Sequence, residues 1–266
     1  MPGHGPALLP SVACPGQSVD SLVACAGQNH KSQFAEDVSL LPTLLLAQHG
    51  ARRHAFVELG AYDGVRGSNT FLLEKCCNWT GTLIEANPAN FAALQRSPRR
   101  ATRVHSGVCN ATGRLAVSET GGVFAGAVET VDPKYAHRAR GRVEVPCDTL
   151  TAVLDGAAHP RHVDFLSLDV EGAEETVLRN LDLSRVGLLV LETARLPPER
   201  AERVDALLRA GGLARSSAVQ IRASAVWARP ALEVVPFAPQ LYPPRFQPAE
   251  LRAALEAAAW RRSRPQ

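Results

Sequence analysis

The 266-residue sequence contains no run of 18 apolar residues, so it predicts no transmembrane helix. The opening "MPGHGPALLPSVACPGQ" lacks the basic region and the continuous apolar stretch of a secretory signal. Charge is nearly balanced, because 29 basic and 26 acidic residues give a net charge of +3, which argues against nucleic acid as the main partner. These absences predict a soluble protein. The cytoplasm is slightly favoured, the compartment stays open, and nothing indicates the oligomeric state.

Cysteine is scarce and shows no scaffold pattern. The six cysteines have neither the C-x-x-C spacing of a zinc site nor the density of a disulfide-rich fold. Cys76 and Cys77 are adjacent and cannot easily bridge each other. Cys109 and Cys147 each end a strand-like run and could meet in space, but buried free cysteine is common, so a disulfide is not favoured.

Two local patterns have ordinary explanations. Basic residues cluster in "RSPRRATR" (96–103) and in the terminal "RRSRPQ", and a solvated surface explains both at least as well as a binding patch. Two glycosylation triplets, Asn78-Trp79-Thr80 and Asn110-Ala111-Thr112, are present, although such triplets often arise by chance.

Strands alternate with helices along most of the chain, which predicts an α/β, doubly wound parallel sheet with helices on both faces. Residues 1–32, rich in Gly, Pro and Ser, are expected to be a flexible leader. The domain is expected over 33–229, and 230–266 form a proline-rich tail with an amphipathic helix. Expected strands are 55–59, 81–86, 101–109, 113–119, 163–170, 187–193, 214–222 and 223–229, and expected helices are 32–46, 68–76, 87–97, 174–181 and 198–212.

Four expected strands end in acids, namely Glu58, Glu85, Asp169 and Glu192. Ligands of parallel sheets bind at the carboxyl ends of the strands. Burying a carboxylate there removes it from water, which costs on the order of several kcal/mol unless the group is paired or hydrogen-bonded. The pattern therefore predicts a ligand that offers hydroxyl groups, amines or a positive charge.

The glycine turn after the first strand favours S-adenosylmethionine over a dinucleotide. Its spacing is Gly60-x-x-x-Gly64-x-x-Gly67 rather than G-x-G-x-x-G, and an acid beside a pyrophosphate would repel it. S-adenosylmethionine carries a sulfonium, an ammonium and a ribose diol. Carboxylates such as Glu58 and Glu85 can bind positive charges and accept hydrogen bonds from hydroxyl groups. An NAD-dependent oxidoreductase is correspondingly disfavoured.

Several motifs in order resemble the FkbM-type methyltransferase family: "FVELGAYDGVRGSNTFLLEKCCNWTGTLIEANPANFAAL", "VHSGVC", "VPCDTL" and "VDFLSLDVEGAEETVL". The resemblance implies a Rossmann-like class I fold and S-adenosylmethionine-dependent O-methylation of sugars or natural products. It implies that the ribose acid is Glu85. The other cofactor-binding residues expected are Glu58, Gly60, Asp63, Gly64, Asn69 and Ser106.

The segment "LSLDVEGAEE" is the expected catalytic edge. Asp169 and Glu171 share a face while the chain is extended, and either could act as base or hold substrate hydroxyls. Glu192 completes the expected catalytic set. A divalent metal on these three acids is conceivable but not favoured. The expected activity is O-methylation of a sugar or small hydroxylated acceptor, and the alternative is an inactive S-adenosylmethionine-binding or interaction module.

The glycine-rich insert at residues 120–130 is the last candidate feature. It follows a predicted strand and is either a mobile lid that selects the acceptor or a surface loop.

Overall fold

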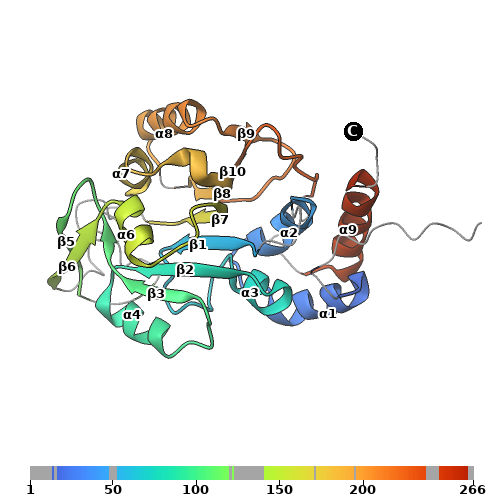
Figure 1. Ribbon diagram of the computed structural model, residues 1–266, viewed down its shortest axis with the longest axis horizontal. Coiled ribbons are helices and arrows are strands. Elements are labelled where there is room, and N and C mark those ends of the chain that lie inside the picture. The colour runs from blue at the N-terminus through green and yellow to red at the C-terminus, as the bar shows by residue number, and fades with distance from the viewer. Residues whose placement is uncertain are drawn as a thin grey trace, which may run out of the picture.

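A seven-stranded sheet forms the centre of the molecule, in the order β3-β2-β1-β7-β8-β10-β9 (Figure 1). The computed structural model describes residues 14, 17–47, 53–119, 122, 141–170, 172–194, 196–237 and 246–262. The strands are β1 (Ala55–Leu59), β2 (Thr80–Glu85), β3 (Thr102–His105), β7 (Val163–Leu168), β8 (Val186–Glu192), β9 (Ala214–Ser216) and β10 (Ser224–Ala228). Neighbouring strands are parallel except at β10, which is antiparallel to both β8 and β9. The predicted α/β architecture is confirmed.

Helices cover both faces of this sheet, because side chains of each strand point alternately to the two sides. Phe56 packs in one hydrophobic cluster with α1 (Val19–Asn29), α2 (Glu36–Leu46), α3 (Phe71–Cys77) and α9 (Pro248–Arg262). Its neighbour Val57 packs in the other, with α6 (Leu150–Gly156), α7 (Glu174–Arg179) and α8 (Pro198–Ala210). The alternation places Glu58 on the same face as Phe56, beneath α3. Because of this placement, the side chain of Glu58 contacts the loop before α3.

A second, three-stranded sheet flanks the first near its β2–β3 end. It contains β4 (Gly107–Val108), β5 (Gly113–Ser118) and β6 (Arg142–Asp148) in the order β4-β6-β5. The single strand expected at 101–109 is therefore divided: β3 pairs with β2, and after Ser106 the chain joins β6 instead. The glycine-rich insert at 120–130 lies outside the described residues except for Gly122.

The expected flexible leader is wrong for the residues just before the domain. Within it, α1 packs against α3 and α9, and Leu22 is fully buried. Figure 1 shows α1, α2 and α9 together at one side of the sheet. The tail helix α9 forms as predicted, and it buries Leu251 and Leu255 in the core. Helix α6, which the sequence analysis did not predict, begins at Leu150 after the capping residue Thr149.

All six cysteines form disulfides, so the preference for free cysteine is wrong. Two bonds join the N-terminal segment to the end of α3, Cys14–Cys77 and Cys25–Cys76. The adjacent cysteines therefore bond to other partners rather than to each other. The third bond, Cys109–Cys147, ties β6 to the residue after β4. In the part of the chain that the structure describes, no helix is long and apolar enough to cross a membrane.

Candidate functional site

A pocket opens at the carboxyl ends of β1, β2 and β7, where the chain order of the sheet reverses. This is the position at which open α/β sheets bind ligands. The pocket measures about 690 Å³ out to its mouth. Its wall is largely apolar, with polar groups from Glu85, Asn90, Ser106 and Asp169; the apolar part includes Leu59, Ile84, Val108, Leu115 and Val177.

The turn after β1 forms the floor of this pocket and requires glycine. Gly60 has φ of +74°, and a Cβ there would overlap the carbonyl oxygen of Asp169. Gly64 has φ of +76°, and a Cβ would lie 2.5 Å from Cδ1 of Leu94. Asp63 holds the turn, because its Oδ1 accepts hydrogen bonds from the backbone N–H groups of Val65 and Arg66. Asp63 therefore shapes the turn, and Gly60 brings backbone to the pocket.

Glu85 ends β2 and lines the pocket while remaining only 5% exposed. Its Oε2 accepts from the backbone N–H of Tyr62 at 2.8 Å, and its Oε1 accepts from that of Asn87, also at 2.8 Å. Burial raises the pKa of Glu85 to about 7, although these hydrogen bonds oppose the shift. A carboxylate has about four acceptor positions. The side chain of Asn90 also hydrogen-bonds with Glu85, and a ligand hydroxyl that enters the pocket can compete for these positions.

Two further polar residues complete the wall. Ser106 stands where the chain passes from one sheet to the other, and its hydroxyl donates to the carbonyl of Gly107 at 2.8 Å. Asn90 was not predicted as a site residue. It lies three positions after the helix-capping Asn87, and its side chain exchanges hydrogen bonds with the backbone of Gly122. The sequence did contain a signal that Asn90 could reach the site, because Asn90 lies in the first turn of the helix that follows Glu85.

Glu58 accepts hydrogen bonds from other residues of the chain, which explains why β1 carries an acid near its end. Its Oε1 accepts from the backbone N–H of Asn69 at 2.8 Å. Its Oε2 accepts from the hydroxyls of Ser68 at 2.8 Å and Thr70 at 2.5 Å. Glu58 is 4% exposed and is not among the described residues that line the pocket. It therefore acts on the site by fixing the loop before α3.

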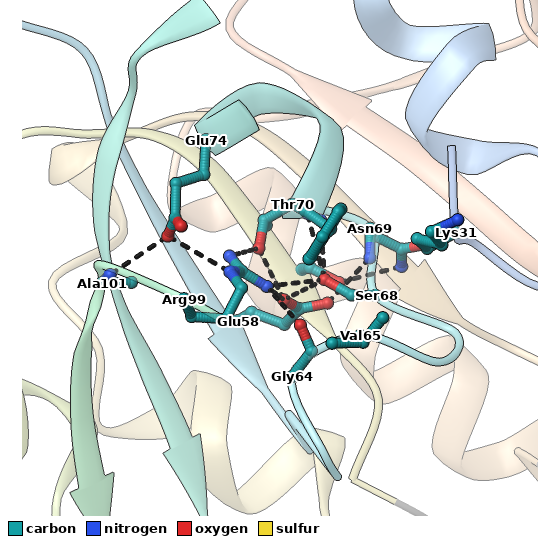
Figure 2. Close-up of polar contacts among 12 residues, drawn as sticks. Lys31, Glu58, Gly64, Val65, Ser68, Asn69, Thr70, Glu74, Arg99 and Ala101 are labelled. Carbon is teal, nitrogen blue, oxygen red and sulfur yellow. Dashed lines mark hydrogen bonds and ion pairs between the residues drawn. The ribbon is translucent and has the colours of Figure 1, made fainter. Parts of the chain in front are cut away.

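Arg99 is a second residue that the sequence analysis missed, because its basic cluster was explained as a solvated surface. Its side chain is fully buried, 3.7 Å from Glu58 and 3.1 Å from Glu74 (Figure 2). The guanidinium also donates to the carbonyl of Gly64 and to the hydroxyls of Ser68 and Thr70. One cation thus connects the glycine turn, the Ser-Asn-Thr loop and α3. The expectation of a solvated surface is wrong for this arginine.

A second pocket, of about 340 Å³, adjoins the first. Asp169 lines both, because it follows β7 between them. The second pocket is rich in acids: Glu36 and Glu192 line it together with Asn69 and Ser224. Asn69, expected to bind the cofactor, thus lies in the second pocket, where its Nδ2 donates to Oγ of Ser167 at 3.0 Å.

Asp169 and Glu192 come together in this second pocket as predicted from the strand ends. Burial raises the pKa of Glu192 to about 8, and the charge of Asp169 and a hydrogen bond with it add to the shift. Burial also raises the pKa of Glu36 and of Glu174. Glu171 lies outside the described residues, so its catalytic role stays a prediction. Among the described residues, no group of three or more His, Cys, Asp or Glu could hold a metal ion.

The sequence profile of the methyltransferase FkbM domain matches residues 58–213, more than half of the chain. The chain belongs to the FkbM methyltransferase family. The match begins at Glu58 and includes Glu85, Asp169 and Glu192. Enzymes of this family depend on S-adenosylmethionine, and the Rossmann-like class I fold and the predicted cofactor are thereby confirmed.

Solved structures of methyltransferases also align with the chain, each at 13% identity. Methyltransferase FkbM from Methylobacillus flagellatus has a TM-score of 0.42, with 79% of this chain and 58% of that one covered. Human methyltransferase-like protein 13, in complex with SAH, has a TM-score of 0.41 and 93% coverage of both chains. Precorrin-6y C5,15-methyltransferase from Geobacter metallireducens has a TM-score of 0.38, with 70% and 84% covered. No curated protein matches the chain.

Proposed function

We propose that this protein transfers the methyl group of S-adenosylmethionine to a hydroxyl oxygen of a sugar or another small hydroxylated acceptor. One observation carries the proposal: Asp169 lies in the walls of two adjoining pockets, one lined mostly by apolar groups and one that also contains the acids Glu36 and Glu192. Methyl transfer requires a donor and an acceptor side by side, in line across a short gap. We assign the donor to the first pocket and the acceptor to the second.

The residues of the first pocket fit the cofactor. Glu85 can accept hydrogen bonds from both ribose hydroxyls, and the apolar wall around Ile84 and Val108 suits an adenine ring. The tight turn at Gly60 lets backbone approach the methionine part. When bound, S-adenosylmethionine supplies a methyl group on a positively charged sulfur. The shape of this pocket would depend on four further residues that were expected to bind the cofactor: Glu58, Asp63, Gly64 and Ser106.

The acids of the second pocket fit a hydroxylated acceptor. Asp169 is exposed enough to meet a substrate hydroxyl and to take its proton as the oxygen attacks. Glu192, whose pKa is raised to about 8, is mostly protonated at pH 7 and hydrogen-bonds with Asp169. Further hydroxyl groups can donate to Glu36, which Ser224 already contacts at 3.3 Å. A phosphate-rich acceptor such as nucleic acid would meet repulsion from the carboxylate of Asp169.

A third pocket shares Ser224 with the second pocket. This third pocket measures about 760 Å³, and Ser216, Ser217 and Gln220 also line it. Hydroxyl and amide groups of this kind bind polar ligands through hydrogen bonds. We therefore include sugars that belong to a longer glycan among the proposed acceptors.

The disulfides bear on where this reaction takes place. All six cysteines are paired, and stable disulfides form in oxidising compartments rather than in the cytosol. We therefore propose an oxidising compartment in place of the slightly favoured cytoplasm.

The test is transfer of labelled methyl from S-adenosylmethionine to a panel of free sugars, glycans and hydroxylated metabolites. We expect label in at least one hydroxylated acceptor and none in acceptors whose hydroxyls are blocked. Label on nitrogen or carbon would contradict O-methylation. If S-adenosylhomocysteine binds but no acceptor takes label, the alternative of an inactive binding module replaces the enzyme.

A further inference from the structure

Two asparagines, Asn78 and Asn110, share a property that no other asparagine of the chain has. All seven asparagines are described by the structure, and these two alone are exposed. They are also the two that begin an Asn-x-Thr triplet, the acceptor motif for N-linked glycans. The others, which are buried or half-buried, lie outside such triplets: Asn29, Asn69, Asn87, Asn90 and Asn180.

We propose that Asn78 and Asn110 carry N-linked glycans. The three disulfides supply independent support, because they indicate an oxidising compartment, and in eukaryotic cells that compartment also attaches N-linked glycans. In the reaction, Nδ2 of asparagine bonds to the anomeric carbon of an oligosaccharide carried on a lipid diphosphate. The bond from that carbon to the diphosphate breaks, the diphosphate leaves, and the amide loses one proton.

Asn78 is an exposed residue in the turn between α3 and β2. It caps the end of α3 with φ of +54°, a left-handed conformation that asparagine tolerates, and β2 begins two residues later. Trp79, the middle residue of the triplet, is buried and fixes the turn from inside. The side chain of Asn78 is the exposed part of this turn, so a sugar on Nδ2 would extend into solvent.

Asn110 occupies the turn between β4 and β5, directly after the disulfide-bonded Cys109. Its Oδ1 accepts a hydrogen bond from Nδ2 of Asn180 at 2.8 Å. That bond uses the oxygen and orients the amide, and it leaves Nδ2 of Asn110 as the atom for attachment. All three residues of this triplet are exposed. The attachment rests on these surfaces and on the disulfides, and it holds whether or not methyl transfer is found.

The experiment uses the full chain purified from the cells that make it. Peptide-N-glycosidase digestion in heavy-oxygen water followed by mass spectrometry marks each asparagine that carried a glycan. We expect both Asn78 and Asn110 to be marked and Asn29 to remain unmarked. If neither is marked in protein whose cysteines are paired, the proposal is overturned. If one is marked, the proposal is overturned for the other.

Matched variants separate the motif from the fold. Thr80→Val and Thr112→Val keep each asparagine but remove the hydroxyl that the acceptor motif requires, so each should remove one step of electrophoretic mobility shift. Thr80→Ser and Thr112→Ser keep the hydroxyl and should retain both steps. A mobility pattern that does not change in the valine variants would overturn the assignment of that site.

Discussion

Replacing Arg99 by methionine is expected to lower the free energy of unfolding by about 3 to 5 kcal/mol, the usual effect of removing one partner from a buried ion pair. Methionine fills much of the same volume but cannot donate hydrogen bonds. Glu58 and Glu74 would then be left buried without their cation, and the hydroxyls of Ser68 and Thr70 would lose a donor. For a domain of this size the midpoint of thermal unfolding should fall by about 10 °C.

The matched control is Arg96→Met, which changes an exposed arginine in the same basic segment. We expect its free energy of unfolding to stay within about 0.5 kcal/mol of the wild-type value. Chemical denaturation with equal m-values for the three proteins would make the comparison direct. Equal stability of the Arg99 and Arg96 variants would show that the buried cation does not hold the site together.

Asp169→Asn is expected to lower the turnover of methyl transfer by about 10²- to 10⁴-fold, the range for losing a general base. Asparagine keeps the size of Asp169 and one acceptor oxygen but cannot take a proton. The affinity for S-adenosylhomocysteine should change little, because the ribose contacts are assigned to Glu85. Single-turnover transfer of labelled methyl, with calorimetry for the cofactor, measures the two effects separately.

A pH profile distinguishes a base from a structural acid. Protonated Glu192 hydrogen-bonds with Asp169 and reduces its basicity, so wild-type turnover should rise as pH increases through about 8. Glu192→Gln should remove this rise, whereas Glu202→Gln on the exposed side of α8 should retain it. Full turnover in Asp169→Asn, or an unchanged profile in Glu192→Gln, would contradict the assigned roles.

Local sequence signals predicted much of the fold. Strand β1 has the expected bounds, and Asn87 caps α4 (Pro88–Gln95) by accepting from the N–H groups of Ala89 and Asn90, as the Asn-Pro start predicts. The acids at the strand ends were also found, because parallel strands bring their carboxyl ends to one edge of the sheet. Asp169 and Glu192 meet for that reason.

What the sequence did not predict depends on distant partners. Arg99 is buried because carboxylates 41 and 25 positions earlier in the chain surround it, and nothing in its own segment signals this. Likewise, the cysteines pair across separations of 63, 51 and 38 residues. The division between β3 and β4 also depends on distant partners, because β3 pairs with β2 whereas the residues after Ser106 pair with β6. Helix α6 did have a local signal that was overlooked, the Thr149 side chain that accepts from the N–H of Ala152.

Calorimetric titration with S-adenosylhomocysteine tests most directly that the pocket at Glu85 holds the cofactor. Ribose hydroxyls donate to the ionised carboxylate, and burial sets the pKa of Glu85 at about 7 before binding. The affinity should therefore be lost as pH falls through 7, and it should be about tenfold weaker at pH 6 than at pH 8. Glu85→Ala should bind at least about tenfold more weakly than wild type at pH 8, with little dependence on pH. Absence of binding by the wild type, or equal binding by Glu85→Ala, would contradict the account.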